Sequence, residues 1–192
     1  MISAQEVKKI LIIDFIKPVC VDPKFLVETG GATLDRHIDL LLKKSQKEAT
    51  LDALAAEYST AVMNSVSLES SRLLMQRATA LNPETGLYRL TRDPKLKINF
   101  YYSFPNEFLI EMAKKIRCEI RVLRAKKGWN FEHPKVVKVV QDEMQKAAKS
   151  MEIIDVEGTH HVHMDNPENV VPHVLDFIFN RPESMTTNQV SL

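Results

Sequence analysis

The hydrophobic and polar positions of this chain follow different periods in different parts of the sequence. Near the N-terminus, the apolar run Ile10 to Ile13 is followed directly by the polar Asp14. A short, wholly apolar run rich in β-branched residues is typical of a parallel strand that is buried on both faces. Residues 17–32 contain two prolines and a Gly–Gly pair, so we expect an irregular connection after this strand.

Helical spacing dominates the next part of the chain. Thr33 and Thr50 are candidate N-caps, each at the start of a tract with helical periodicity. The apolar residues expected to point inward are Leu34, Ile38, Leu41 and Leu42 in the first helix and Leu51, Leu54, Ala55, Tyr58 and Val62 in the second, and a third helix is expected over residues 67–78. The helical period is lost near residues 86–90. Residues 33–105 are too long and too helical for one crossover, which predicts a helical lid inserted between two strands.

Strands and helices then alternate. Strands are predicted for 119–125 and 152–157, with helices around 109–116 and 136–147. The last helix is expected to have Asn166 as its N-cap and Pro167 at its first position. This alternation predicts an α/β fold with a parallel sheet and right-handed crossovers. The expected domains are a first core strand and connection (1–32), a helical lid (33–105), an α/β core (106–180) and a flexible tail (181–192).

Charge and composition narrow the classes of function. The chain has 26 basic and 25 acidic residues, so no overall field draws it to nucleic acid or to a membrane. A local cluster of basic residues is compatible with nucleic-acid binding. The near-neutral total charge of the chain and the lack of interleaved aromatic residues favour instead a solvated surface. The cluster comprises Lys114, Lys115, Arg117, Arg121, Arg124, Lys126 and Lys127. Two cysteines fit a reducing compartment, and no apolar segment is long enough to span a bilayer. We therefore expect a cytoplasmic protein.

The segment after the second of these later strands carries the most informative chemistry. Gly158 ends the predicted strand, and His160 follows two residues later. Catalytic groups in open parallel sheets gather beyond the carboxyl ends of the strands, and histidine can act as a general base near neutral pH. Two other interpretations are open: a histidine that satisfies backbone groups in a tight turn, or a metal site with His161 and His163. No Cys or carboxylate is spaced to complete a zinc shell, which disfavours the metal.

This segment also resembles a known family. The G-x-H turn and the Pro-Glu helix start resemble the final strand, catalytic-histidine turn and last helix of α/β-hydrolases. The stretch Gly158-Thr159-His160-His161-Val162-His163-Met164 is similar to the serine-hydrolase-like family in particular, as are Leu73-Leu74-Met75-Gln76-Arg77 and Gly86-Leu87 leading into Arg92-Asp93. The likeness covers most of residues 5–180 and is weak in the insert.

The resemblance implies a role for three residues. His160 would be the base of a catalytic triad, and an Asp or Glu beyond the preceding strand would support the imidazolium that forms. No Asp stands in residues 126–133, so Glu132 is the first candidate for this acid. Asp14, at the end of the first strand, is the alternative position in some α/β-hydrolases, and it is otherwise a structural carboxylate.

The nucleophile that such a triad needs is missing from these residues. A serine hydrolase places its serine in a G-x-S-x-G elbow, and no two of the five glycines bracket a serine in that way. The resemblance therefore implies the C-terminal part of an α/β-hydrolase, without esterase activity on its own. Removing even one oxyanion donor costs such enzymes roughly 10²–10³ in rate. No cofactor and no metal are implied.

The expected partners follow from the same picture. The complete protein would take a small-molecule ester-type substrate. The first strand would lie beside the nucleophile strand of a complete fold, so its open edge invites pairing with an N-terminal half or with a second copy of the chain. A non-enzymatic interaction protein that pairs through this edge is the alternative function. Neither nucleic acid nor a membrane span is expected.

Overall fold

The structure is a computed structural model that describes residues 7–17, 27–28, 31–32, 34–35, 38–39, 42, 47–93, 104–129 and 132–179. The chain divides into two compact units. The core unit comprises residues 1–20 and 104–192, and the insert comprises residues 21–103. The tail predicted for 181–192 lies outside the described residues.

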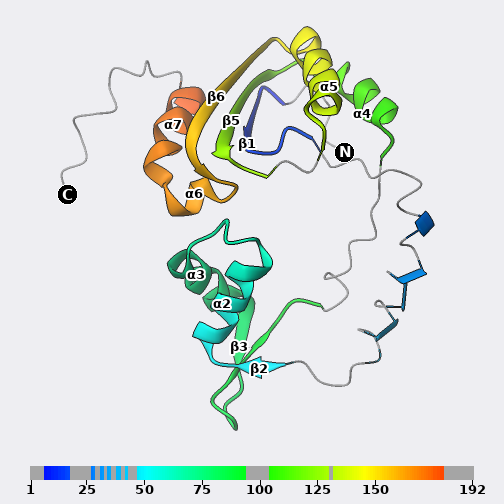
Figure 1. The fold of residues 1–192 in the computed structure, drawn as a ribbon. Coiled ribbons are helices and arrows are strands. Elements are labelled where there is room, and N and C mark those ends of the chain that lie inside the picture. The colour runs from blue at the N-terminus through cyan, green and yellow to red at the C-terminus, as the bar shows by residue number, and fades with distance from the viewer. Residues whose placement is uncertain are drawn as a thin grey trace, which may run out of the picture. The chain divides into compact units, whose positions relative to one another are not determined.

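The core unit contains a parallel sheet of β1 (Lys9–Ile13), β5 (Glu119–Lys127) and β6 (Ser150–Thr159) in the order β1-β5-β6 (Figure 1). The predicted α/β fold with a parallel sheet is confirmed. Both later strands are longer than predicted. β6 continues through Gly158 to Thr159, so that His160 follows the strand directly.

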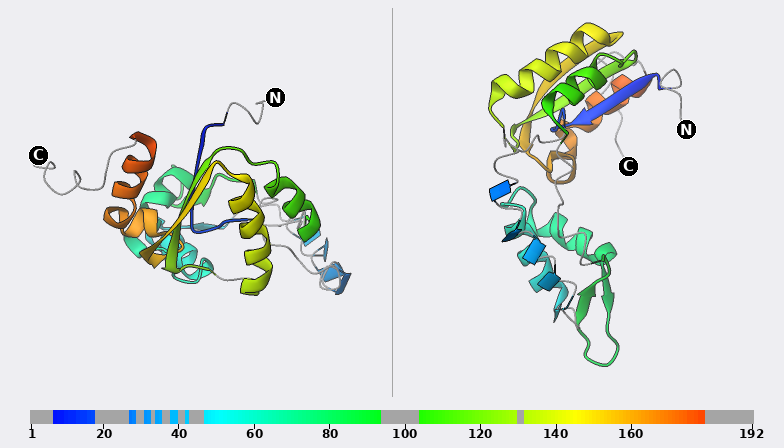
Figure 2. Two further views of the ribbon diagram at one scale, coloured as in Figure 1. Left: turned by 90° about the horizontal axis from the view of Figure 1, so that it is seen from above. Right: turned by 90° about the vertical axis from the view of Figure 1, so that its right-hand side faces the viewer.

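Helices cover both faces of this sheet (Figures 1 and 2). α4 (Asn106–Ala113) and α5 (Pro134–Ala147) lie on one face, and α6 (Val162–Asp165), a 3₁₀ turn (Pro167–Asn169) and α7 (Val171–Phe179) lie on the other. Alternation along β5 divides the core: Ile120 and Val122 pack toward α4 and α5, whereas Leu123 and Ala125 pack toward α6 and α7. This arrangement fits the apolar run Ile10 to Ile13 in β1, which is typical of a strand whose two faces are both covered.

The last helix differs from the prediction. Asn166 and Pro167 begin a 3₁₀ turn, and Asn166 makes no side-chain capping bond there; α7 begins only at Val171. Pro172 explains the break, because a proline inside a continuous helix lacks the N–H and clashes with the carbonyl four residues earlier. In the first turn of a new helix the same proline is tolerated.

The insert contains two capped helices and a small sheet. Thr50 caps α2 (Leu51–Ala61) with a side-chain hydrogen bond, as predicted, and Ser67 caps α3 (Leu68–Ala78) in the same way. Leu54, Ala55 and Met75 form the buried centre between these helices. The insert also contains strands that were not predicted: β2 (Glu48–Ala49), β4 (Tyr88–Leu90) and β3 (Thr79–Leu81) form an antiparallel sheet in the order β2-β4-β3. These strands are too short for their alternation to stand out in the sequence.

The first predicted helix of the insert also needs correction. Helical residues are described already at 27–28 and 31–32, before the predicted start at Thr33. Leu34, Ile38 and Leu42 are helical but exposed rather than inward-facing. Thr33 and Leu41 themselves lie outside the described residues.

Candidate active site

The first component of the site is the carboxylate of Asp14, which directly follows β1. Its φ of 70° lies in the left-handed region, which Asp enters more readily than most residues. This turn ties Asp14 to the neighbouring strand: its backbone N–H donates to the carbonyl of Leu123 at 2.8 Å, and its Oδ1 accepts from the N–H of Ala125 at 3.2 Å. The carboxylate is therefore fixed against the end of β5, with only 4% of the side chain exposed.

The second component is His160, in the turn between β6 and α6. Gly158 makes this turn possible, since its φ of 140° is rare for other residues and an added Cβ would lie 2.5 Å from Cγ2 of Val162. Val162 is fully buried in the core beside β5 and β6. The chain therefore makes a tight turn packed on the buried Val162, and this turn places His160 at the carboxyl end of the sheet.

The structure brings these two residues together. Nδ1 of His160 lies 2.6 Å from Oδ2 of Asp14, although the residues are far apart in the sequence and their strands are separated by β5. An ionised carboxylate can only accept, so with Asp14 ionised this hydrogen bond is donated by Nδ1, and the lone pair of a neutral ring then lies on Nε2. The imidazole is 20% exposed. It is not a histidine sealed in the core.

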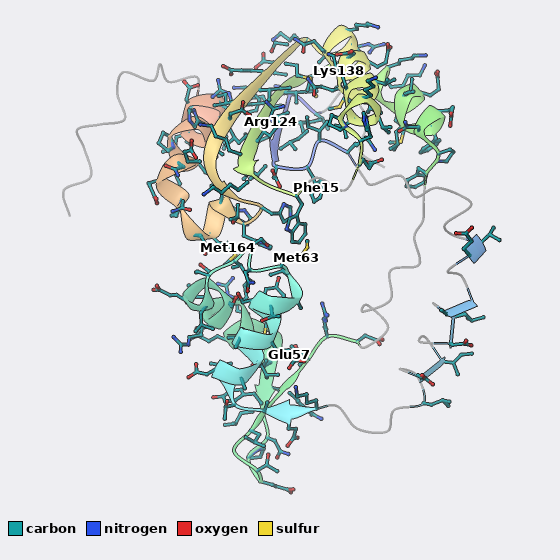
Figure 3. All side chains as sticks on the ribbon, in the orientation of Figure 1. Phe15, Glu57, Met63, Arg124, Lys138 and Met164 are labelled. Atoms are coloured by element: carbon teal, nitrogen blue, oxygen red, sulfur yellow. The ribbon has the colours of Figure 1, made fainter. Side chains whose placement is uncertain are left out.

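Aromatic rings surround the imidazole. Trp129 stacks on it with ring centres 4.1 Å apart and planes 19° apart, and Phe15 meets it edge-on at 4.9 Å. His161 adds a second edge contact at 4.9 Å. Phe15 lies where β1 ends, at the carboxyl edge of the sheet (Figure 3). The sequence analysis assigned no role to Phe15 or Trp129; the signal it could have used is that both stand beside a strand end.

Glu132 lies elsewhere at the same edge. Nζ of Lys17 donates to its Oε2 at 2.5 Å, and the two side chains are only 3% and 11% exposed. The hydrogen bond to His160 that the sequence analysis assigned first to Glu132 is made instead by Asp14, its second candidate. The reason is local: Glu132 comes two residues before α5, and its side chain is directed to Lys17 rather than across β5.

A pocket of about 570 Å³ opens beside Asp14 on the α5 side of the sheet. Arg124 binds both carboxylate oxygens of Asp155 on its wall, at 2.6 and 3.0 Å. This hydrogen bond from Arg124 lowers the pKa of Asp155 below its usual value. Figure 3 labels Arg124 and Lys138, from β5 and α5 respectively. The lining residues are Asp14, Phe15, Ile16, Lys17, Arg124, Ala125, Lys126, Gly128, Trp129, Glu132, Pro134, Val137, Lys138, Gln141 and Asp155.

Much of the basic cluster noted in the sequence forms ion pairs. Arg121 binds Glu152 at 2.8 Å and Asp176 at 2.5 Å, and Lys126 pairs with Glu157. These carboxylates balance the positive charges along β5, so that the cluster is not a field of uncompensated charge.

The described residues offer neither a metal site nor a membrane-spanning helix. Within them, no group of three His, Cys, Asp or Glu side chains is placed to hold a metal ion. None of the helices in the described ranges combines the length and the apolar character that crossing a bilayer requires.

The chain resembles known proteins in sequence and in fold. No protein-family profile matches the chain. The chain is 31% identical over 175 residues to a probable serine hydrolase of Drosophila melanogaster, a match that covers 90% of this chain and 53% of that protein. The chain thus spans about half the length of this curated relative.

Solved structures show the same partial coverage. A hypothetical protein of Pseudomonas aeruginosa PAO1 matches with a TM-score of 0.68 and 19% identity, over 91% of this chain and 59% of its own. The thioesterase domain from the curacin biosynthetic pathway matches with a TM-score of 0.62 and 20% identity, over 88% of this chain and 58% of that domain. An esterase of Mycobacterium tuberculosis matches with a TM-score of 0.60 and 16% identity, over 93% of this chain and 57% of the esterase.

The parallel sheet, its helical layers and these likenesses define part of the α/β-hydrolase fold. In sequence, 90% of the chain is similar to about half of a protein described as a probable serine hydrolase.

Proposed function

We propose that this chain supplies the general base of an ester-hydrolysing serine hydrolase. His160 is the base, and Asp14 is the carboxylate that supports it. The observation that carries the proposal is the 2.6 Å contact between Nδ1 of His160 and Oδ2 of Asp14 at the carboxyl edge of a parallel sheet. Catalytic groups of open α/β sheets gather at this edge.

The chemistry follows from the orientation of the ring. With Nδ1 bonded to Asp14, the lone pair on Nε2 can accept the proton of a serine hydroxyl as that hydroxyl attacks an ester carbonyl. The imidazolium that forms is stabilised by the Asp14 carboxylate, and it can later return the proton to the leaving alcohol. The carboxylate is buried and anchored to the N–H of Ala125, so it needs no rearrangement during the reaction.

The serine is the part that these 192 residues do not provide in recognisable form, because no G-x-S-x-G elbow occurs in the sequence. In the proposal it comes from a nucleophile-bearing segment that pairs with this chain or is joined to it. The proposed substrates are small esters or related acyl compounds, because the structural neighbours include an esterase and a thioesterase domain.

The first test uses the pure chain. Incubation with p-nitrophenyl esters and with a fluorophosphonate probe is expected to give neither saturable turnover nor labelling. Saturable labelling of one serine would contradict the proposal that the nucleophile lies elsewhere.

The second test restores a nucleophile. The part of the Drosophila protein that this chain does not match is joined upstream of residue 1, and ester hydrolysis by the chimera is measured. His160→Gln is expected to abolish turnover, and Asp14→Asn to lower kcat by up to about 10⁴-fold, the scale known for a triad acid. His163→Gln serves as the matched histidine control. An active chimera that tolerates His160→Gln would refute the role of this ring.

The alternative is a non-enzymatic protein that acts through association. Two observations favour it. Within the described residues no strand pairs with the second edge of β1, and the outward face of α7 is apolar, with Val171, Leu175, Ile178 and Phe179 exposed. Unpaired edges and apolar patches are both typical of interfaces.

The hydrodynamic mass of the chain in dilute solution tests this alternative. A dimer that Ile178→Glu converts to a monomer would support this alternative. Lys135→Glu, at an exposed position of α5, is the control for added negative charge. A stable monomer that shows no concentration dependence would count against it.

A further inference from the structure

We propose that Trp129 is a positioning residue that holds the His160 ring in line with Asp14, and that Gly128 places Trp129 there. This inference rests on the proposed role of His160 as the general base. It concerns how the ring is oriented, which is a property of the chain by itself.

The stack is the first observation. Trp129 covers one face of the imidazole with ring centres 4.1 Å apart and planes 19° apart. A ring bound through a single nitrogen can still swing about that hydrogen bond. The indole removes this freedom because tilting the imidazole would break the parallel contact. Phe15 restricts the ring further with an edge contact at 4.9 Å.

The second observation explains why Trp129 reaches the ring at all. The loop after β5 passes directly over the Asp14 carboxylate: a Cβ on Gly128 would lie 2.1 Å from its Oδ1 and 2.6 Å from its Oδ2. The N–H of Gly128 donates to the carbonyl of Ala125 at 3.0 Å, which fixes this turn. Only a residue without a side chain can approach the carboxylate so closely, and the residue that follows is Trp129.

The two observations together show that one loop contacts both the acid and the base. The loop from β5 bridges the gap between the ends of β1 and β6, whose strands do not pair with each other. Gly128 packs on the acid and Trp129 packs on the base. The charged and titratable groups that face the imidazole are Asp14, from the turn after β1, and His161, from its own turn.

The test is the exchange of the Nδ1 proton of His160 with water, measured by NMR on the full chain. An aromatic stack of this kind corresponds to about 2- to 10-fold in the population of the aligned ring. Trp129→Leu is therefore expected to speed exchange by about 2- to 10-fold and to shift the ring ¹⁵N signals away from a single fixed tautomer. Trp129→Phe, which keeps an aromatic face, is expected to restore most of the protection.

A matched control removes an aromatic stack elsewhere in the same unit. Phe104 and Phe108 stack at 4.8 Å, so Phe108→Leu is expected to leave the exchange at His160 unchanged. The proposal is overturned if Trp129→Leu leaves the exchange at its original rate. It is also overturned if the backbone amides of β5 accelerate by the same factor as the ring proton, since that result indicates a purely structural tryptophan.

Gly128→Ala gives an independent measurement. The added methyl group must displace either the Asp14 carboxylate or the loop, so the Nδ1 proton is expected to exchange faster and the emission of Trp129, the sole tryptophan of the chain, to shift. Unchanged exchange and unchanged emission would overturn the placement of Gly128. Failure of the chimera to hydrolyse esters would bear on the proposed function and would leave these ring measurements intact.

Discussion

Two carboxylates lie at the same end of the core sheet, and their surroundings differ in one respect that decides their chemistry. The carboxylates of Asp14 and Glu132 are both largely buried, at 4% and 11% exposure. Asp14 contacts an imidazole, whereas Glu132 contacts the ammonium group of Lys17. An imidazole both accepts and releases a proton near neutral pH, and an ammonium group provides a fixed positive charge.

The comparison teaches that burial and position alone do not identify a catalytic acid. Glu132 is near the end of β5, where the sequence analysis expected the acid, but its partner makes it part of a structural ion pair. Asp14 is on the more distant strand and reaches the ring because its turn directs the carboxylate across the end of β5. The following substitutions separate the two environments.

The largest effect on stability is expected at the Lys17–Glu132 pair. Glu132→Gln leaves a buried ammonium group without this carboxylate, and removing one partner of a buried pair costs about 3–5 kcal/mol. Urea unfolding followed by circular dichroism measures the loss. Replacing both partners, Lys17→Met with Glu132→Leu, is expected to recover most of it. A single variant within about 0.5 kcal/mol of the parent chain would mean that this pair is not structural.

A smaller effect on stability is expected at Asp14. Asp14→Asn keeps the size of the side chain and tolerates the left-handed backbone, so it removes mainly the charge; hydrogen bonds to charged groups contribute about 1.5–3 kcal/mol. Asp14→Ala is expected to cost roughly 1–2 kcal/mol more because alanine is strained at this φ.

The Asp14 and Glu132 variants can be distinguished by the NMR signals of the His160 ring. Asp14→Asn should change the tautomer of His160 in ¹⁵N spectra, whereas Glu132→Gln should leave it as it is. A tautomer that responds to Glu132→Gln and not to Asp14→Asn would reverse the assignment of the two carboxylates.

The smallest effect is expected at a third carboxylate of the same edge, Asp155. Its side chain is 46% exposed and paired with Arg124, so Asp155→Asn should cost at most about 0.5 kcal/mol, less at high salt. Arg124 lowers the pKa of Asp155, so the contribution is complete above the usual carboxyl pKa of about 4 and is lost as the pH falls through the lowered value. The variant and the parent chain should therefore differ in their free energy of unfolding at neutral pH, and this difference should disappear at acidic pH. A gap that widens in acid would contradict this sign.

Much of the sheet and part of the site could be predicted from the sequence. β1 is visible as an apolar run because a strand covered on both faces has no polar alternation, whereas only shorter apolar runs between charged residues mark β5 and β6. Asp14 and His160 are recognisable as polar residues that follow these runs, and parallel strands bring such ends to one edge. The α/β fold was predicted on this basis and is confirmed.

Other features depend on information that periodicity does not contain. The direction of the Glu132 side chain is set by Lys17, whose pairing has no local signal. The stack of Trp129 depends on the close approach of Gly128 to Asp14, which arises only after the loop has folded. In the insert, strands of two or three residues are too short to show an alternating pattern.

The insert also has a consequence for how the protein can vary. The chain leaves the core unit after residue 20 and returns at residue 104, between two strands that pair directly. Closing a flexible excursion becomes more costly only slowly with its length, by about 0.6 kcal/mol for each doubling. Related chains can therefore acquire longer, shorter or differently folded excursions at this junction while β1 and β5 keep their register. Divergence should concentrate there, while the residues that hold the imidazole can stay constant.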